Sequence, residues 1–245
     1  MEIKMKTIIT KVFAVLFLVL LAASIKPMKA QEISLGTDIV SRYIWRGFDL
    51  GGNTPSLQPT VEYSNGGFAF GFWGAYSMAD PAGLNEIDVY ASYSFDLAES
   101  GSLSLGVTDY TNPNSGTPWG NFNNYDDPAG PGAHFVELNV GYSGPESFPV
   151  SLSFNYFFHN VANNPIYFQV GYTTSVKDVG LDLFVGGTPG EAGGYYALTN
   201  FGFINVGFTA SKSIKITNDF SLPLSGSVIV NPATENVFYV VGISL

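Results

Sequence analysis

Few residues of this sequence could support catalysis. Cysteine is absent from the 245 residues, which excludes thiol nucleophiles, disulfides and zinc–thiolate sites. The two histidines, His134 and His159, each lack a serine two residues later. A serine and a histidine brought together from different segments stay an open alternative for nucleophilic catalysis. Both histidines adjoin predicted loops, where a hydrated side chain is the ordinary case, so we expect no enzymatic activity and no cofactor.

Metal and nucleic-acid binding are also weakly supported. Asp126-Asp127 could offer carboxylate oxygens to Ca²⁺, but the segment lacks the alternating acidic spacing of an EF-hand loop, so a solvated pair is the better interpretation. Ten basic residues against 20 acidic residues give a net charge of −10. Phosphate contacts need clustered Lys and Arg, so we expect no nucleic-acid partner.

The remaining candidates are charged residues that share one face of predicted strands. Arg42 and Arg46 are four residues apart and therefore lie on one side of an extended chain. The acids with the same predicted orientation are Asp38, Glu62, Glu86, Asp88, Asp96, Glu137 and Asp182. Two arginines cannot neutralise seven acids, so a passage lined by this face would favour cations. These residues could also form cross-strand ion pairs, with Glu62 opposite Arg42 in the first hairpin.

The elements that must position these residues are strands. Apolar residues occupy the odd positions from 87 to 97, and similar period-two alternation runs through the chain after residue 31. Connections alternate between short turns and longer loops, the longest at 111–133. Twelve strands are predicted, at residues 32–46, 56–64, 67–78, 85–97, 101–110, 134–143, 149–159, 166–176, 180–187, 198–211, 219–230 and 236–245.

This pattern predicts an all-β fold, an antiparallel up-and-down β-barrel of about 12 strands that crosses the bacterial outer membrane. A soluble β-sandwich is the alternative. Its solvent face would be charged, whereas the polar face here is mainly Ser, Gly, Asn and Thr and the other face is dense in Phe, Tyr, Val and Leu. Lipid outside and a crowded lumen inside explain that contrast better. The aromatic residues expected to point outward include Tyr43, Trp45, Tyr76, Tyr142, Phe158 and Tyr172.

Residues 1–30 have the features of a secretory signal segment. Lys4, Lys6 and Lys11 accompany an apolar run at 12–23, which is too short to span a bilayer. Removal of residues 1–30 leaves residues 31–245 as one barrel domain with a net charge of about −14. We expect this domain in the outer membrane, with its lipid and lipopolysaccharide as partners.

Both ends of the predicted barrel carry recognisable segments. The first is Ser41-Arg42-Tyr43-Ile44-Trp45-Arg46-Gly47, and the second runs from Leu222-Pro223-Leu224-Ser225 through Val228-Ile229-Val230-Asn231-Pro232 to Leu245. In these segments the chain resembles the TorF-type porin family of outer-membrane proteins. The resemblance implies a barrel with a channel-like role and names no substrate. The alternating apolar residues of the last strand also resemble the terminal strands that barrel-assembly machinery recognises.

These observations predict a channel for passive diffusion of small solutes or ions, weakly cation-selective, with Arg42 and Arg46 at its constriction. The alternative is a non-conducting barrel with a structural, adhesive or receptor role through its extracellular loops. A barrel of twelve strands is intermediate between the eight-strand barrel, whose interior is filled by side chains, and the open 16-strand porin. The width of the lumen therefore decides between a channel and a non-conducting barrel. Many small inward residues favour an open path. Several features would narrow it: inward Tyr90, Phe157, Phe184 and Phe201, or an inward fold of the loop at 111–133.

Overall fold

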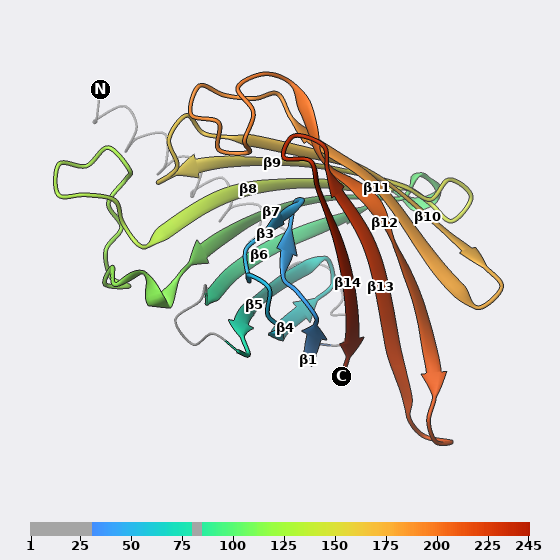
Figure 1. Cartoon of the computed structure of the whole chain (residues 1–245). Helices are drawn as coiled ribbons and strands as arrows, with labels where there is room; N and C mark the ends of the chain where they lie inside the picture. Colours follow the sequence, from blue (N-terminus) through green and yellow to red (C-terminus); the bar gives the residue numbers. More distant parts are fainter. Residues whose placement is uncertain (1–30, 80–84) are drawn as a thin grey trace.

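The computed structural model describes residues 31–79 and 85–245; the expected signal segment at 1–30 lies outside the described residues. Twelve strands form a closed barrel (Figure 1). The barrel strands are β1 (Glu32–Val40), β4 (Ser56–Asn65), β5 (Phe68–Ser77), β6 (Glu86–Asp96), β7 (Ser102–Thr111), β8 (His134–Ser143), β9 (Val150–His159), β10 (Ile166–Val176), β11 (Val179–Thr188), β12 (Gly202–Lys215), β13 (Ser221–Asn231) and β14 (Asn236–Ser244). The predicted all-β antiparallel barrel of about 12 strands is confirmed.

Three further elements interrupt the connections between these strands. Two 3₁₀ turns cover Ala98–Ser100 and Pro113–Ser115, and a separate two-stranded sheet pairs β2 (Ile44–Trp45) with β3 (Phe48–Asp49). No helix in the described part of the chain is long and apolar enough to cross a membrane.

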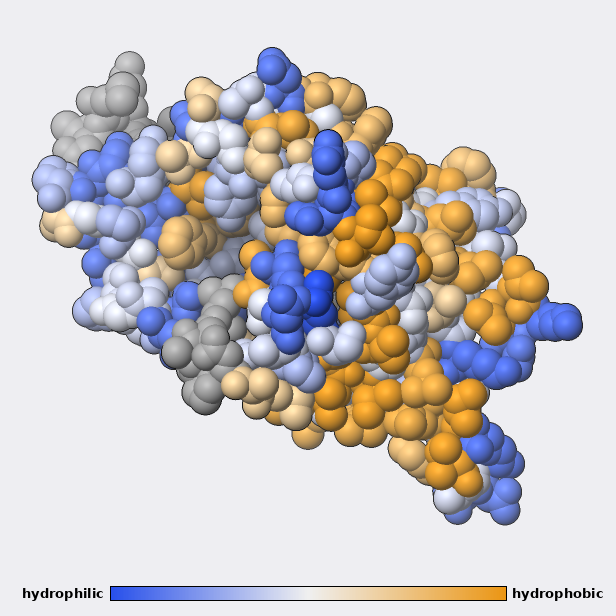
Figure 2. Space-filling model, in the orientation of Figure 1, coloured by the Kyte–Doolittle hydropathy of each residue, from blue (hydrophilic) through white to orange (hydrophobic). Residues whose placement is uncertain are grey.

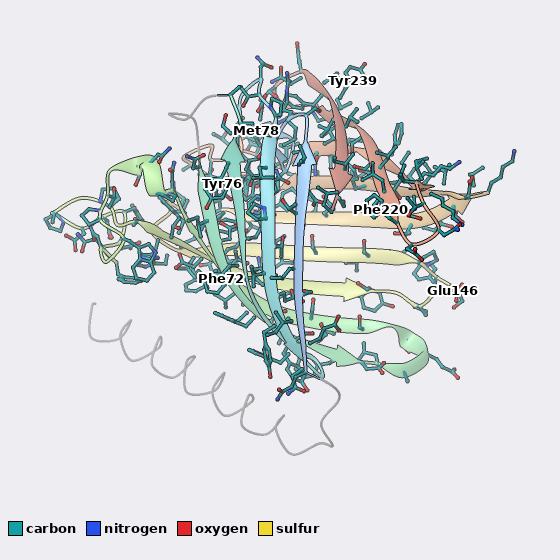
Figure 3. The ribbon with its side chains drawn as sticks, turned by 90° about the horizontal axis from the view of Figure 1, so that it is seen from below. Phe72, Tyr76, Met78, Glu146, Phe220 and Tyr239 are labelled. Atoms are coloured by element: carbon teal, nitrogen blue, oxygen red, sulfur yellow. The ribbon has the colours of Figure 1, made fainter. Side chains whose placement is uncertain are left out.

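Strands that follow one another in sequence are neighbours in the barrel, and β14 closes it against β1. At one end, the turn end, five short connections join the strands, and Glu146 and Phe220 lie there (Figure 3). At the other end, the loop end, the connections are mostly longer, and the loop between β7 and β8 extends far from the barrel (Figure 1). The predicted alternation of short and long connections is therefore present.

Apolar side chains cover the outer face of the barrel. They gather over β12–β14 in Figure 2 and give way to hydrophilic residues at the turns and loops. Tyr239 points away from the barrel (Figure 3), and the outward residues Phe72, Leu152 and Phe158 are also exposed. Period-two alternation explains this pattern, because successive side chains of a strand point to opposite faces.

The inner wall changes in character along the barrel. Near the turn end it carries small side chains, among them Ser92, Ser94, Ser104, Gly106, Gly141, Ser151, Ser153, Gly171, Thr173, Ser175, Ser211 and Ser225. Ser151, Thr173 and Ser175 are exposed although they point inward, so this half of the lumen is hollow. Near the loop end the inward residues Glu137, Phe157 and Tyr167 are buried, so that half is filled. We call the hollow half the vestibule.

The first strand differs from the prediction. β1 ends at Val40 rather than at residue 46, because residues 41–55 turn into the barrel. Pairing between β1 and β14 is therefore short, from Asp38↔Ser244 to Val40↔Gly242. β12 is also shifted: it begins at Gly202, not at residue 198, and continues to Lys215.

Candidate functional site

Residues 41–55, which we call the lumen hairpin, fill the loop-end half of the barrel. β2 and β3 are joined by Arg46-Gly47, whose φ angles of 49° and 81° match the positive φ pair of a type I′ turn. Gly47 packs against β12 so closely that a Cβ atom would lie 2.0 Å from the carbonyl oxygen of Ile204. Asn231 of β13 donates a 3.1 Å hydrogen bond to the carbonyl of Gly47. The tip of the hairpin is thus held against β12 and β13, which are three and two strands, respectively, from β1 around the barrel.

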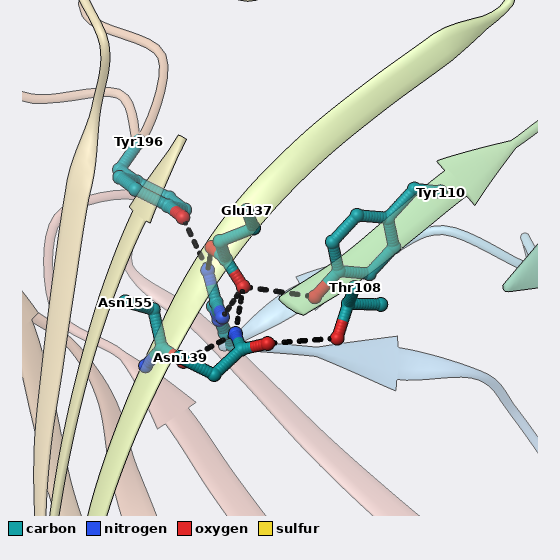
Figure 4. A network of polar contacts seen from close by, with 7 residues as sticks. Thr108, Tyr110, Glu137, Asn139, Asn155 and Tyr196 are labelled. Atoms are coloured by element: carbon teal, nitrogen blue, oxygen red, sulfur yellow. Dashed lines mark hydrogen bonds and ion pairs between the residues drawn. The ribbon is translucent and has the colours of Figure 1, made fainter. Parts of the chain in front are cut away.

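A buried ion pair lies at the tip of this hairpin. Arg46 donates from Nη1 and Nη2 to the two carboxylate oxygens of Glu137, at 2.6 and 2.8 Å. The Tyr110 hydroxyl and the Asn139 amide donate to Oε2 of Glu137 at 2.9 and 2.8 Å (Figure 4). Arg46 also donates to the Tyr196 hydroxyl oxygen at 2.6 Å. Glu137 is 0% exposed, so this bidentate pair is shielded from water and salt.

Aromatic rings enclose the ion pair. The guanidinium of Arg46 lies 4.4 Å from the ring centroid of Trp45 and 4.5 Å from that of Tyr167. Trp45 in turn contacts the ring of Tyr196, whose loop follows β11. Burial raises the pKa of Tyr195, in the same loop, to about 12. Burial also raises the pKa of Tyr196, although the charge of Arg46 opposes that effect, so both phenols keep their protons at neutral pH.

A second acidic group lies beside the base of the hairpin. The hydroxyl of Tyr43 donates to Glu86 at 3.1 Å, and its ring packs 5.4 Å from that of Trp73. Asp88 is 7% exposed, and its Oδ1 has no hydrogen-bond partner within residues 31–79 and 85–245. Glu86 and Asp88 have no salt bridge to a basic side chain in that part of the chain.

Trp45 separates two cavities. The outer chamber, about 410 Å³, is lined by the hairpin residues Trp45 and 47–50, by Tyr195 and Tyr196, and by Asn236 and Phe238 of β14. The inner chamber, about 350 Å³, is lined by Tyr43, Trp45, Trp73, Asp88, Tyr90, Thr108 and Tyr110. The residues that follow on the inner wall toward the turn end are Ser92 and Gly106, so the inner chamber adjoins the vestibule.

The structure corrects the predicted positions of the hairpin residues. Arg42 and Arg46 are not on the barrel wall. Arg42 bonds Asn53 and lies 3.4 Å from Asp49, within the hairpin itself. Tyr43 and Trp45, predicted to face lipid, point into the lumen instead. Residues 41–46 do alternate as a strand does. They lie in the lumen, however, where the turn at Arg46-Gly47 pairs Ile44–Trp45 with Phe48–Asp49 and not with the wall.

The predicted wall acids keep their inward orientation but do not form a single cluster. Glu86, Asp88 and Glu137 are buried in the filled half. Glu62 lies opposite Ser34, not opposite Arg42, and accepts a 2.9 Å hydrogen bond from Tyr90. Two of the remaining predicted acids line the wall nearer the turns: Asp182, bonded to Thr173, and Asp96, bonded to the amide of Ala98. Asp38, opposite Gln58, lies near the end of β1 from which the hairpin departs.

Two of the features that would narrow the lumen are not found in the described residues. Phe201 is 64% exposed and stacks on Phe168, so it does not narrow the lumen, whereas Tyr90, Phe157 and Phe184 do point inward. The loop at 111–133 does not enter the barrel but extends away from it (Figure 1), and its Trp119 side chain is exposed.

His134 was expected to be hydrated but is 1% exposed. It lies on the outer side of β8, where Nδ1 is 2.7 Å from Asp109 Oδ2 and Nε2 is 2.6 Å from the carbonyl oxygen of Trp119. The ring of Phe122 stacks on it at 3.9 Å. His134 therefore attaches the loop to the barrel.

Comparison with known proteins places this geometry in a family. The model of a family described as bacterial protein of unknown function (Gcw_chp) matches residues 25–193. The chain belongs to this family. The Gcw_chp match includes the lumen hairpin, both acidic groups and the wall as far as β11, whereas Tyr195 and Tyr196 lie beyond it. No curated protein matches the chain. The resemblance to the TorF-type porin family stays a prediction.

Proposed function

We propose that this protein is an outer-membrane channel for small solutes or ions, with a weak preference for cations and with the lumen hairpin as its constriction. The apolar outer face and the hydrophilic ends of the barrel support a membrane setting. The vestibule supports a path, because its small inward side chains leave the turn-end half of the lumen hollow. Removal of the signal segment and insertion by the barrel-assembly machinery belong to the same proposal.

The charge of the inner wall supports the preference for cations. Arg46 is paired with Glu137, and Arg42 is paired with Asp49. Six other inward acids have no salt bridge to a basic side chain in the described part of the barrel: Asp38, Glu62, Glu86, Asp88, Asp96 and Asp182. Fixed carboxylates along a narrow path raise the local concentration of cations and repel anions.

The observation that carries the proposal is the contrast between a hollow vestibule and a lumen closed by one short segment. A structural barrel without a path would be filled by its own wall residues, as eight-strand barrels are. Here the wall near the turns is lined by Ser, Thr and Gly, and closure depends on residues 41–55 and the aromatic residues around them.

The second candidate is a non-conducting barrel that acts through its loops. The buried Arg46–Glu137 pair favours it, because a hairpin held by several hydrogen bonds closes the lumen firmly. Planar-bilayer recording on refolded protein separates the two candidates. Steady current steps with a reversal potential that favours K⁺ under a KCl gradient support the channel. A correctly folded but silent barrel supports the non-conducting role, and a preference for Cl⁻ contradicts the electrostatic argument.

A further inference from the structure

The inner chamber has a lining suited to one class of ligand. Five of its seven lining residues are aromatic, and the other two are Asp88 and Thr108. Aromatic faces attract cations through their quadrupole, most strongly where water is excluded. A chamber walled by Tyr and Trp with one carboxylate therefore combines apolar contact with a single negative charge.

Asp88 is the buried acidic side chain that lines this site. It is more than nine-tenths buried, and its Oδ1 accepts no hydrogen bond from the described residues. The charged groups around it are acidic: Glu86 two residues away on the same face, Glu137 and Asp109. Arg46, on the hairpin, is engaged by Glu137. Glu86 and Asp88 are hydrogen-bonded to each other through their side chains, so the pair can share one proton and keep one negative charge, which a cation in the cavity would neutralise.

We propose that the inner chamber binds a small organic cation, an alkylated ammonium group whose charge lies beside Asp88 and whose methyl groups contact Trp45, Trp73 and Tyr90. The chamber offers few oxygen ligands, which disfavours a hard metal ion that requires six or more. Its volume of about 350 Å³ is ample for a choline-sized molecule. This inference builds on the proposed function, because it identifies one class of cation on the proposed path.

Tryptophan fluorescence tests the site without any current. The chain has three tryptophans, two of which line the inner chamber, so a Trp119→Phe background leaves only the two reporters. Choline is titrated into this variant, refolded in detergent, beside its uncharged isostere 3,3-dimethylbutanol. We expect saturable quenching by choline and at least tenfold weaker binding of the isostere. Asp88→Asn should weaken choline binding about tenfold or more.

Matched variants keep this test decisive. Asp182→Asn removes the same charge from the wall outside the chamber and should leave binding unchanged. Asp88→Glu keeps the charge if Asp88→Asn does not fold, and it should bind choline more tightly than the isostere. Equal binding of choline and the isostere, or no saturable quenching, overturns the proposed site. Cation-selective current without choline binding refutes this site alone, whereas binding by a silent barrel refutes the channel alone.

A different observation concerns the edge between β1 and β14. The pairing that begins at Asp38↔Ser244 reaches Val40↔Gly242, and the amide of Ser41 still donates to the carbonyl of Val241 at 2.8 Å. Beyond that point the chain leaves the wall, and no described strand pairs with β14 on this side from residue 236 to 240. Unpaired strand edges are costly in lipid.

If the register between β1 and β14 continued along the chain, residues 41–46 would pair with this edge of β14. That register would pair Tyr43 with Tyr239 and Trp45 with Val237, and Arg46 would reach Asn236 at the start of β14. Tyr239 and Val237 are 73% and 50% exposed and face outward, so Tyr43 and Trp45 would join an outward aromatic stripe. We infer that residues 41–46 exchange between the lumen and this edge, and that the lumen opens when they pair with β14.

A disulfide tests this exchange, because the chain has no cysteine of its own. Tyr43 bonds Glu86 inside the barrel whereas Tyr239 points away from it, so cysteines at these two positions are opposite each other only when residues 41–46 lie along β14. We expect Tyr43→Cys/Tyr239→Cys to crosslink in bilayers under mild oxidation and the crosslinked protein to conduct more.

The control pair is Tyr43→Cys/Leu152→Cys, which has an equally outward cysteine on β9 and should not crosslink. Failure of the Tyr239 pair to crosslink, or equal crosslinking of both pairs, overturns the exchange. The crosslink is read on a gel, so its failure is distinct from a failure to conduct.

Discussion

Neutralising Glu137 should release the lumen hairpin. Glu137→Gln keeps the size of the side chain but leaves the guanidinium of Arg46 buried without its carboxylate. Removal of one partner of a buried ion pair costs about 3–5 kcal/mol. At 1.4 kcal/mol per factor of ten, the equilibrium between the bound and released hairpin shifts by roughly 10² to 10⁴. The backbone pairs of Glu137 with Thr108 and Phe157 are unaffected, so the barrel itself should stay folded.

Two measurements report release of the lumen hairpin in the Trp119→Phe background. Acrylamide should quench Trp45 more strongly, and single-channel current should rise, in Glu137→Gln relative to the parent. Asp182→Asn is the control, because it removes an exposed wall charge that has no contact with the hairpin. The double variant Arg46→Met/Glu137→Met should recover much of the closed state, since it leaves no buried unpaired charge. Unchanged quenching and current in Glu137→Gln would refute the reasoning.

Four other substitutions test the assignment of faces, the packing of the hairpin and the attachment of the loop. Val89→Arg and Leu152→Arg should each lower the free energy of folding into bilayers by about 2–4 kcal/mol, because they place charge on the outer face; unchanged urea titrations would mean that the assignment of faces is wrong. Gly47→Ala should increase acrylamide quenching of the hairpin tryptophan, because its φ is positive and its Cβ would meet β12; equal quenching would argue against close packing there. His134→Ala should speed protease cleavage at 121–132 on intact cells, and protection of that segment in both proteins would place the loop end on the periplasmic side.

The strands could be predicted from the sequence because apolar and polar residues that alternate over about ten residues indicate a strand and not a helix. Ten of the predicted strands overlap their observed counterparts almost throughout, the strand predicted at 198–211 is shifted by four residues, and the first fails only after Val40. Residues 41–46 alternate as a strand does, so the pattern could not reveal whether they continue the wall or enter the lumen. The signal that distinguishes the two is Arg46-Gly47, a dipeptide compatible with a tight turn of positive φ.

The site could be predicted only in part for a related reason. The inward orientation of Glu86, Asp88 and Glu137 could be predicted because side chains alternate between the two faces within a single strand. Their partners come from distant segments: Arg46 is 91 residues from Glu137 and 150 from Tyr196. His134 was misjudged because its burial depends on a loop that folds over the outer face, and sequence spacing carries no information about that contact.

The central claim is that the lumen hairpin closes a barrel that is otherwise open. Replacing residues 42–54 by a short Gly-Ser linker, and recording single-channel current from the refolded protein, tests it most directly. We expect large, steady, cation-preferring steps from the shortened protein and much smaller steps from the full-length chain. A shortened barrel that folds normally and conducts no more than the full-length protein would contradict the account.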